Sequence, residues 1–394
     1  MSTPAIRTTV VGSYPVPDWL VALPSQQSLI DATRVVFKTQ EMAGIDVVAD
    51  GEFYRFDVNH PDTNGMIEYF IRPMTNIRSA VTRADIEEFS KQEGMGFRAE
   101  PAGVVEGPID EGTLNLPRDY RRARALTNHP MKFTLTGPHM LCKTLMDHHY
   151  KSKPDLALAL GKALAKQVAE LHPQVLQIDE ANIPGHPDEA PWAADAINQI
   201  LDAAGKGSGV RVQGSGNLPL AESPSQSLAV SQNNTLEMKG TGASTKGTGA
   251  FNPSLNPQPS TLNPQKAVHL CFGNYGGQTI QKGAYKALMP FFNALDCDHL
   301  VLEFARRGYD ELEHFKELKP SIALGVGVID IKDNEVESSA EVAASIEKAV
   351  KTLGAERVRW VHPDCGFWML HRSVADRKIR ALVEGRDQFL GRSL

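Results

Sequence analysis

Short apolar runs alternate with stretches of helical periodicity along most of the chain. Each run is apolar at successive positions rather than at every second one, which is typical of parallel strands buried on both faces. The predicted strands span residues 8–14, 46–52, 132–138, 175–181, 268–274, 299–304, 322–330 and 358–366. The predicted helices span residues 28–44, 154–171, 189–205, 340–354 and 374–390.

This alternation of eight strands with helices predicts an α/β fold, a closed (β/α)8 TIM barrel formed by a single catalytic domain over residues 1–394. A doubly wound open sheet is the competing interpretation. The turn after the first strand carries no G-x-G-x-x-G pattern, which counts against a dinucleotide-binding fold of that kind.

Two segments interrupt the alternation. Residues 55–130 form a long, charge-rich excursion after the second strand, which we expect to be a subdomain or a lid over the barrel mouth. Residues 207–265 are dense in Gly, Ser, Asn, Pro and Gln, a composition that cannot bury enough apolar surface to order itself. We interpret them as a disordered, low-complexity insertion between a helix ending near Lys206 and a strand beginning near Lys266. A gene-model artefact is the alternative origin.

Composition narrows the class of protein. The 394 residues are 41% hydrophobic and 22% charged, which are ordinary globular values. The net charge of −6 and the lack of a basic stretch argue against a nucleic-acid or membrane-surface partner. No apolar run is long enough to span a bilayer, no signal peptide is apparent, and four irregularly spaced cysteines make no disulfide framework. These features favour a reducing, cytoplasmic location.

Polar side chains gather where the predicted strands end. In a barrel the C-terminal ends of the strands converge on one face, which is where active sites lie. The residues at or near these ends are Glu52, Asp179, Glu180, His269, Cys271, Glu303, Asp330 and Cys365.

Four of these residues have the chemistry of a zinc site. His269 and Cys271 are two positions apart, so on a strand they point to the same face. Glu303 ends the next strand, and Cys365 follows the last one. A histidine, two thiolates and a carboxylate suit tetrahedral zinc. A lone buried cysteine is more often a packed hydrophobic residue, the role we assign to the two remaining cysteines, Cys142 and Cys297.

Several segments resemble the C-terminal catalytic zinc barrel of cobalamin-independent methionine synthases, in a single-barrel form that lacks the family's second barrel. The resemblance implies zinc held by His269, Cys271, Glu303 and Cys365. It also implies that Gly12 and Ser13 meet the homocysteine carboxylate, while Glu52 and Asp179 hold its ammonium. The segments are VVGSYP (10–15), DGEF (50–53), LQIDEA (176–181), HLCFGN (269–274), LEFARRG (302–308), GVIDIK (327–332) and HPDCGF (362–367).

The expected activity is zinc-dependent methylation of the homocysteine thiol to give methionine, with either a folate or a methyl-corrinoid as donor. Asp330 and Lys332 are the expected catalytic residues, although the family has a histidine where Lys332 stands in GVIDIK. The tryptophan that stacks on folate in the family has no counterpart in TLTGPHMLCKTLMD. A lysine ammonium is a weaker acid than an imidazolium, so it is less able to protonate the departing folate amine. The missing tryptophan removes the stacking surface for the folate. Both departures favour the corrinoid.

Three other functions are weighed against this one. An epoxyalkane:coenzyme M transferase also uses a zinc thiolate, but coenzyme M has no ammonium for Glu52 and Asp179 to bind. Uroporphyrinogen decarboxylase shares the barrel superfamily and needs no zinc ligands. A non-catalytic zinc-binding protein or inactive paralogue is the third alternative, against which the retention of every ligand argues.

Overall fold

We describe the fold from a computed structural model, which describes residues 6–60, 65–91, 98–206, 263–273, 279 and 281–392. The chain divides into two compact units, one formed by residues 1–207 with 259–394 and the other by 208–258. All described residues belong to the first unit. The predicted low-complexity insertion lies outside the described residues, except for its last three positions, 263–265.

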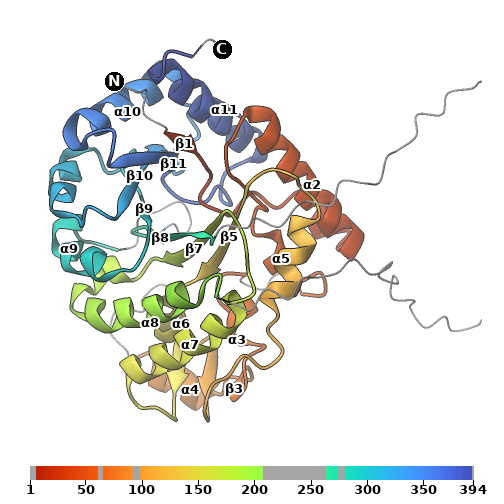
Figure 1. Ribbon diagram of the computed structural model, residues 1–394. Coiled ribbons are helices and arrows are strands. Elements are labelled where there is room, and N and C mark those ends of the chain that lie inside the picture. Colours follow the sequence, from red (N-terminus) through yellow and green to blue (C-terminus); the bar gives the residue numbers. More distant parts are fainter. Residues whose placement is uncertain are drawn as a thin grey trace, which may run out of the picture. The chain divides into compact units, whose positions relative to one another are not determined.

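Eight parallel strands form one sheet around which the helices are arranged (Figure 1). Its order is β1-β11-β10-β9-β8-β7-β5-β2, and every hydrogen-bonded pair of neighbours is parallel. Parallel bridges Thr9–Val47 and Ser13–Gly51 join the two edge strands and close the sheet. The predicted (β/α)8 barrel is therefore confirmed. The strands are β1 (Arg7–Thr8), β2 (Val48–Ala49), β5 (Met131–Thr136), β7 (Val175–Glu180), β8 (Gln265–Leu270), β9 (His299–Leu302), β10 (Ala323–Ile329) and β11 (Val358–Pro363).

The helices predicted from periodicity are present, and local signals explain where two of them start and stop. Helix α2 begins after the N-cap Ser25 and ends at Gly44, which adopts a left-handed conformation with φ 85°. Ser338 and Glu341 form a capping box at the start of α10. No helix within the described ranges is long and apolar enough to cross a membrane. The helices beside the barrel strands are α1 (Asp18–Ala22), α2 (Gln26–Ala43), α7 (Lys153–Val168), α8 (Ala190–Ala203), α9 (Tyr285–Ala294), α10 (Ser339–Leu353) and α11 (Arg372–Phe389).

The excursion after β2 folds into a small layer of its own. Its strands β3 and β4 pair antiparallel, and β6, which follows the excursion, extends this sheet in the order β3-β4-β6. Phe89, Val104 and Met146 make a separate small core there. That this layer acts as a lid stays a prediction. Its elements and the short elements that follow or precede it in the chain are η1 (Phe53–Arg55), α3 (Glu68–Ile71), β3 (Ile77–Arg78), α4 (Arg83–Phe89), β4 (Gly103–Val105), α5 (Leu116–Arg124), α6 (Pro138–Thr144) and β6 (Leu145–Asp147). The remaining short helices follow β7 and β9: η2 (Ile183–Gly185), η3 (Pro187–Glu189) and η4 (Asp310–Glu317).

The first two strands are much shorter than their apolar runs predicted. Regular pairing covers two residues in each of β1 and β2, and single bridges continue it beyond them. At the end of β2 the chain leaves extended geometry, because Gly51 and Glu52 both have positive φ values, 74° and 62°. The apolar runs correctly predicted that these segments are buried, but they did not predict the bend at the end of β2.

The two described segments that flank residues 207–262 lie beside each other. A Cβ atom added to Gly205 would stand 2.8 Å from Pro264 Cδ and 3.2 Å from Asn263 Oδ1. We predict that a variant joining Lys206 directly to Asn263 unfolds at an equal or higher temperature than the full chain, since a shorter loop costs less closure entropy. Thermal unfolding followed by circular dichroism measures this shift.

A matched control replaces residues 208–262 with a Gly/Ser linker of the same length. We expect it to unfold no higher than the shortened variant. A lower unfolding temperature for both variants than for the full chain would show that the natural segment packs into the fold.

Candidate metal and amino-acid site

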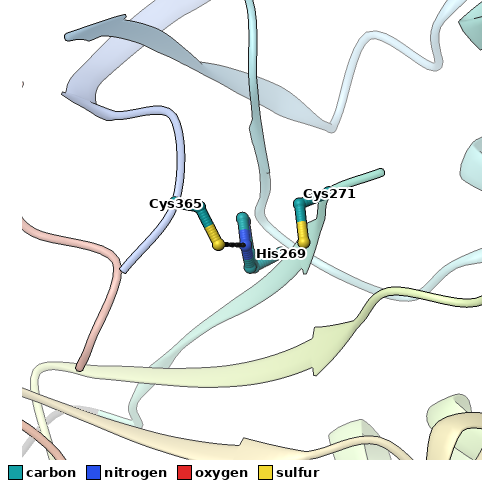
Figure 2. Close-up of side chains that lie close together, drawn as sticks. All are labelled: His269, Cys271 and Cys365. Carbon is teal, nitrogen blue, oxygen red and sulfur yellow. Dashed lines mark hydrogen bonds between the residues drawn. The ribbon is translucent and has the colours of Figure 1, made fainter. Parts of the chain in front are cut away.

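Three soft ligands meet at the C-terminal end of the barrel. His269 lies on β8, Cys271 directly follows that strand, and Cys365 follows β11. Their side chains point toward one another (Figure 2), and one ligand atom from each lies within 4.8 Å of the others. His269 Nε2 is 3.6 Å from Cys365 Sγ, while Nδ1 is 2.9 Å from the Val301 carbonyl oxygen. With its proton on Nδ1, the ring donates to that carbonyl and leaves Nε2 free to bind a metal.

The charges of these three side chains are strongly coupled. The hydrogen bond with Cys365 lowers the pKa of Cys271 well below its usual range, and the nearby His269 adds to this effect against burial. The same hydrogen bond and burial raise the pKa of Cys365. Burial alone would lower the pKa of His269, but Cys271 and Asp179 raise it, to about 9. A thiolate beside an imidazole and a second thiol is a donor set that fits zinc.

Glu303, the fourth predicted ligand, lies at the end of β9 and is fully buried. It is not one of the three residues whose ligand atoms cluster within 4.8 Å. Burial, followed by the negative charge of Cys271, raises its pKa to about 8. Within the described part of the chain neither carboxylate oxygen has a hydrogen-bond partner. A buried carboxylate is costly unless it faces a cation. The Lys332 ammonium is such a cation, 3.7 Å from Oε2, and Glu303 stays our predicted fourth ligand.

The two expected catalytic residues occupy different surroundings. Lys332 reaches the predicted ligands, because its buried Nζ lies 3.7 Å from Glu303 Oε2 and donates to Thr279 Oγ1 at 2.9 Å. Asp330 contacts neighbouring loop residues. Its carboxylate accepts the Lys332 backbone N–H at 2.8 Å and pairs with Arg306 at 3.2 Å. Lys332 thus lies beside a predicted ligand, and the catalytic roles of both residues stay predictions.

Asp364 was not among the residues singled out by sequence, yet it joins two of the predicted ligands. Its carboxylate accepts the backbone N–H groups of Phe304, Ala305 and Arg306 at 2.7–2.9 Å. These residues directly follow Glu303, and Asp364 directly precedes Cys365. The contact therefore ties the loop after β9 to the end of β11. The position of Asp364 inside HPDCG is the one sequence signal that could have pointed to it.

The amino-acid end of the predicted site lies at the seam where the barrel closes. A Cβ atom on Gly12 would stand 2.2 Å from Glu52 Oε1, so only glycine lets this carboxylate lie against the backbone. Likewise, a Cβ on Gly366 would stand 1.9 Å from Ser13 Oγ. Gly12 and Ser13 therefore lie between Glu52 and the loop that carries Cys365.

Asp179 and Glu180 point in opposite directions, as successive strand residues do. Glu180 accepts the backbone N–H groups of His139 and Met140, both at 3.0 Å, and so caps α6 rather than the site. Asp179 faces the barrel interior, where burial and the charge of Glu52 raise its pKa to about 7.

Arg55 is the second site residue that sequence reasoning missed. Its buried guanidinium lies 3.2 Å from Glu52 Oε2 and 3.9 Å from Asp179 Oδ2. The two carboxylates expected to hold a substrate ammonium thus already share one cation of the protein. Its position three residues after Glu52 gave no sign of this contact, which depends on the bend at Glu52.

Comparison with known proteins places this geometry in context. The family described as "Cobalamin-independent synthase, Catalytic domain" matches residues 6–197 and 265–387. A "Methionine synthase" from Saccharolobus solfataricus is 25% identical over 97% of this chain and 94% of its own length. A "Methionine synthase" from Sulfurisphaera tokodaii is also 25% identical, over 97% and 92%.

Solved structures agree with the fold. A B12-independent methionine synthase from Shewanella sp. W3-18-1, in complex with selenomethionine, superposes with a TM-score of 0.70 at 22% identity, covering 98% of this chain and 99% of its own. A putative vitamin-B12 independent methionine synthase from Listeria monocytogenes gives a TM-score of 0.61 at 16% identity, with 96% of both chains covered.

The buried Asp50 beside this pocket generates a pH prediction. Burial raises its pKa from 3.8 to about 7, although Oδ1 accepts the Glu52 backbone N–H at 2.8 Å. Between these pH values the folded protein binds more protons than the unfolded chain, so its unfolding free energy falls as pH rises. Asp50→Asn does not titrate. We predict that the wild-type unfolding free energy falls relative to this variant by up to about 4 kcal/mol from pH 4 to 7.

Urea unfolding at several pH values measures that difference. Asp333→Asn is the control, because Asp333 is exposed and its pKa is lowered by the Glu335 backbone N–H. Its difference from the wild type should stay nearly constant from pH 5 to 7. A constant difference for Asp50→Asn as well would show that Asp50 is ionised throughout the range.

Proposed function

Because this chain belongs to the family of cobalamin-independent synthase catalytic domains and is a methyltransferase of the methionine synthase type, we propose that it methylates the thiol of homocysteine in a zinc-dependent reaction. The observation that carries the proposal is the meeting of His269, Cys271 and Cys365, near the residues predicted to hold an amino acid. Homocysteine carries a thiol and an α-amino acid group, so it would use both parts at once.

The thiol end of the substrate would be held by zinc. His269, Cys271 and Cys365 would provide three ligands, and Glu303, whose buried carboxylate accepts no hydrogen bond from the described residues, is the proposed fourth. Zinc, when bound, stabilises a coordinated thiol as its thiolate at neutral pH, which is the nucleophilic form. The buried walls of the site keep water from competing for the reacting sulfur.

The amino-acid end would meet the seam of the barrel. The backbone and hydroxyl of Gly12 and Ser13 are available to the substrate carboxylate, and Glu52 and Asp179 to its ammonium. This arrangement disfavours the coenzyme M alternative, because a sulfonate thiol without an ammonium would leave these two buried carboxylates without their ligand.

The surroundings of Lys332 bear on the methyl donor. A tertiary amine such as methyltetrahydrofolate must be protonated as it leaves, whereas a corrinoid cobalt centre leaves without a proton. The Lys332 ammonium is already engaged by Glu303 and Thr279. Segment 137–144, where the family's folate-stacking tryptophan is expected, has no tryptophan, and seven of its eight residues are buried. Both features favour a methyl-corrinoid donor.

The four free cysteines suit a reducing, cytoplasmic compartment.

The zinc site is tested by metal content. We predict about one zinc per chain for the wild type, in keeping with a four-ligand site, and loss of most of it in Cys365→Ser. Cys297→Ser is the matched control, because Cys297 is a buried cysteine whose pKa burial raises to about 12 and that takes no part in the cluster. Atomic spectroscopy after exhaustive dialysis gives the stoichiometry. Full occupancy in Cys365→Ser would show that the ligands are wrongly assigned.

The donor is tested by a side-by-side assay of methionine formation. We predict that methylcobalamin supports a rate at least about a hundredfold higher than methyltetrahydrofolate, since a missing general acid costs about that much. Lys332→His should not rescue the folate reaction, because the stacking surface would still be absent.

An epoxide with coenzyme M forms the third arm of this assay. Rapid methionine synthesis from the folate would refute the donor argument. Product in the epoxide arm alone would identify the enzyme as an epoxide-opening thiol transferase. No product in any arm, with zinc bound, would identify an inactive paralogue.

A further inference from the structure

The Arg55 guanidinium is held from several sides at the mouth of the barrel. Its side chain is 2% exposed. Nε donates to the Tyr54 hydroxyl at 2.8 Å, Nη2 donates to Thr134 Oγ1 at 2.8 Å, and Nη1 donates to Glu52 Oε2 at 3.2 Å. Its central carbon also lies 5.0 Å from the centre of the Phe70 ring. A buried arginine with these fixed partners has a single orientation.

Arg55 also orients both carboxylates of the amino-acid pocket. Thr134, which accepts from Nη2, itself donates to Glu52 Oε1 at 2.9 Å, so Glu52 is held through both of its oxygens. Asp179 Oδ2 lies 3.9 Å from Nη2, and Asp179 Oδ1 accepts from Gln177 Nε2 at 2.7 Å. The distances show a close pair with Glu52 and a looser one with Asp179.

In their fully ionised state the charges of this group do not cancel. Asp50, Glu52 and Asp179 provide three carboxylates, while Arg55 and Lys132 provide two cations. Lys132 Nζ is tied to the Val10 carbonyl and to Gln177, one side chain away from Asp179. His269, which also faces Asp179, is neutral when its Nε2 serves as a metal ligand. With all five groups ionised, one negative charge remains to be compensated.

We propose that Arg55 is a specificity-determining positioning residue: it compensates one of the charges of Glu52 and Asp179 and fixes both carboxylates so that the pocket accepts one substrate ammonium. This inference rests on the proposed function, because it takes an amino-acid thiol as substrate. Without Arg55 the two carboxylates would repel each other and turn away from the ammonium position. A thiol that lacks the amino group would be affected far less.

Binding of the reaction product tests this without a methyl donor. Isothermal titration calorimetry compares L-methionine with its deamino analogue, 4-(methylthio)butanoate, on the wild type and on variants. For Arg55→Gln we expect the Kd of L-methionine to rise about 10- to 100-fold, and that of the analogue by less than about threefold. Arg55→Lys keeps the charge but not the forked donor geometry, so its effect on L-methionine should be intermediate.

Arg98→Gln is the matched control, because Arg98 pairs with Glu68 at 2.5 Å and contacts neither Glu52 nor Asp179. It should bind both ligands as the wild type does. Thermal unfolding verifies that each variant is folded. If Arg55→Gln does not fold, Arg55→Lys carries the test, with the same selective loss of L-methionine at smaller magnitude.

The outcomes separate the two claims. Equal weakening of both ligands, or no change in either, would overturn the role of Arg55 while leaving the proposed function intact. A wild-type protein that binds neither ligand would overturn the proposed function and this inference with it. A loss confined to the ligand with the amino group would establish Arg55 as the residue that sets the preference for amino-acid thiols.

Discussion

The seam between β1 and β2 is the constraint on which the rest of the site depends. Eight parallel strands enclose a barrel only if the first and last edges meet, and here they meet through the bridges Thr9–Val47 and Ser13–Gly51. The second of these bridges contains Ser13, one of the residues predicted to bind the amino-acid end of the substrate. Closing the barrel therefore also positions that predicted site, and the two glycines Gly12 and Gly366 are needed where backbone and side chains come too close for a Cβ atom.

The interior of this barrel mouth is polar, which is unusual for a region with so little exposure. Its charged groups are linked to one another: Lys132 through Gln177 to Asp179, and Arg55 to Glu52. Burial still shifts Lys132 and Asp179 toward their neutral forms, with a pKa of about 7 for each. With every group ionised the network is one cation short, and perturbed pKa values of this kind are typical of sites that bind a complementary ligand.

The sequence predicted the strands well and their ends less well. Periodicity found all eight barrel strands because burial on both faces leaves an uninterrupted apolar run. It overestimated β1 and β2, since the bend at Glu52 arises from a left-handed backbone that hydrophobicity does not record. The meeting of His269, Cys271 and Cys365 followed from the convergence of strand ends. The distance from the Glu303 carboxylate to these three ligand atoms depends on the tertiary structure, and the spacing of residues along the chain does not determine it.

Residues that act through other residues were the hardest to foresee. Neither Arg55 nor Asp364 is expected to bind the metal or the substrate directly. Arg55 contacts the Glu52 carboxylate, and Asp364 holds the backbone after Glu303. Asp179 is 124 positions from Arg55, and Phe304 is 60 positions from Asp364. Spacing along the chain does not predict such contacts, and only the HPDCG motif around Asp364 offered a local signal. Glu180 shows the converse, because its place beside Asp179 suggested the site, whereas the alternation of side chains along β7 turns it to cap α6.

The clamp of Asp364 on the backbone at 304–306 has a consequence for how the site responds to its ligands. Three hydrogen bonds join the end of β11 to the loop after β9, so the backbone holds Glu303 and Cys365 in a fixed relation to each other. Most of the conformational entropy needed to bring these two donors together is lost when the chain folds, not when an ion arrives. A preorganised site of this kind gains affinity because little further ordering accompanies binding.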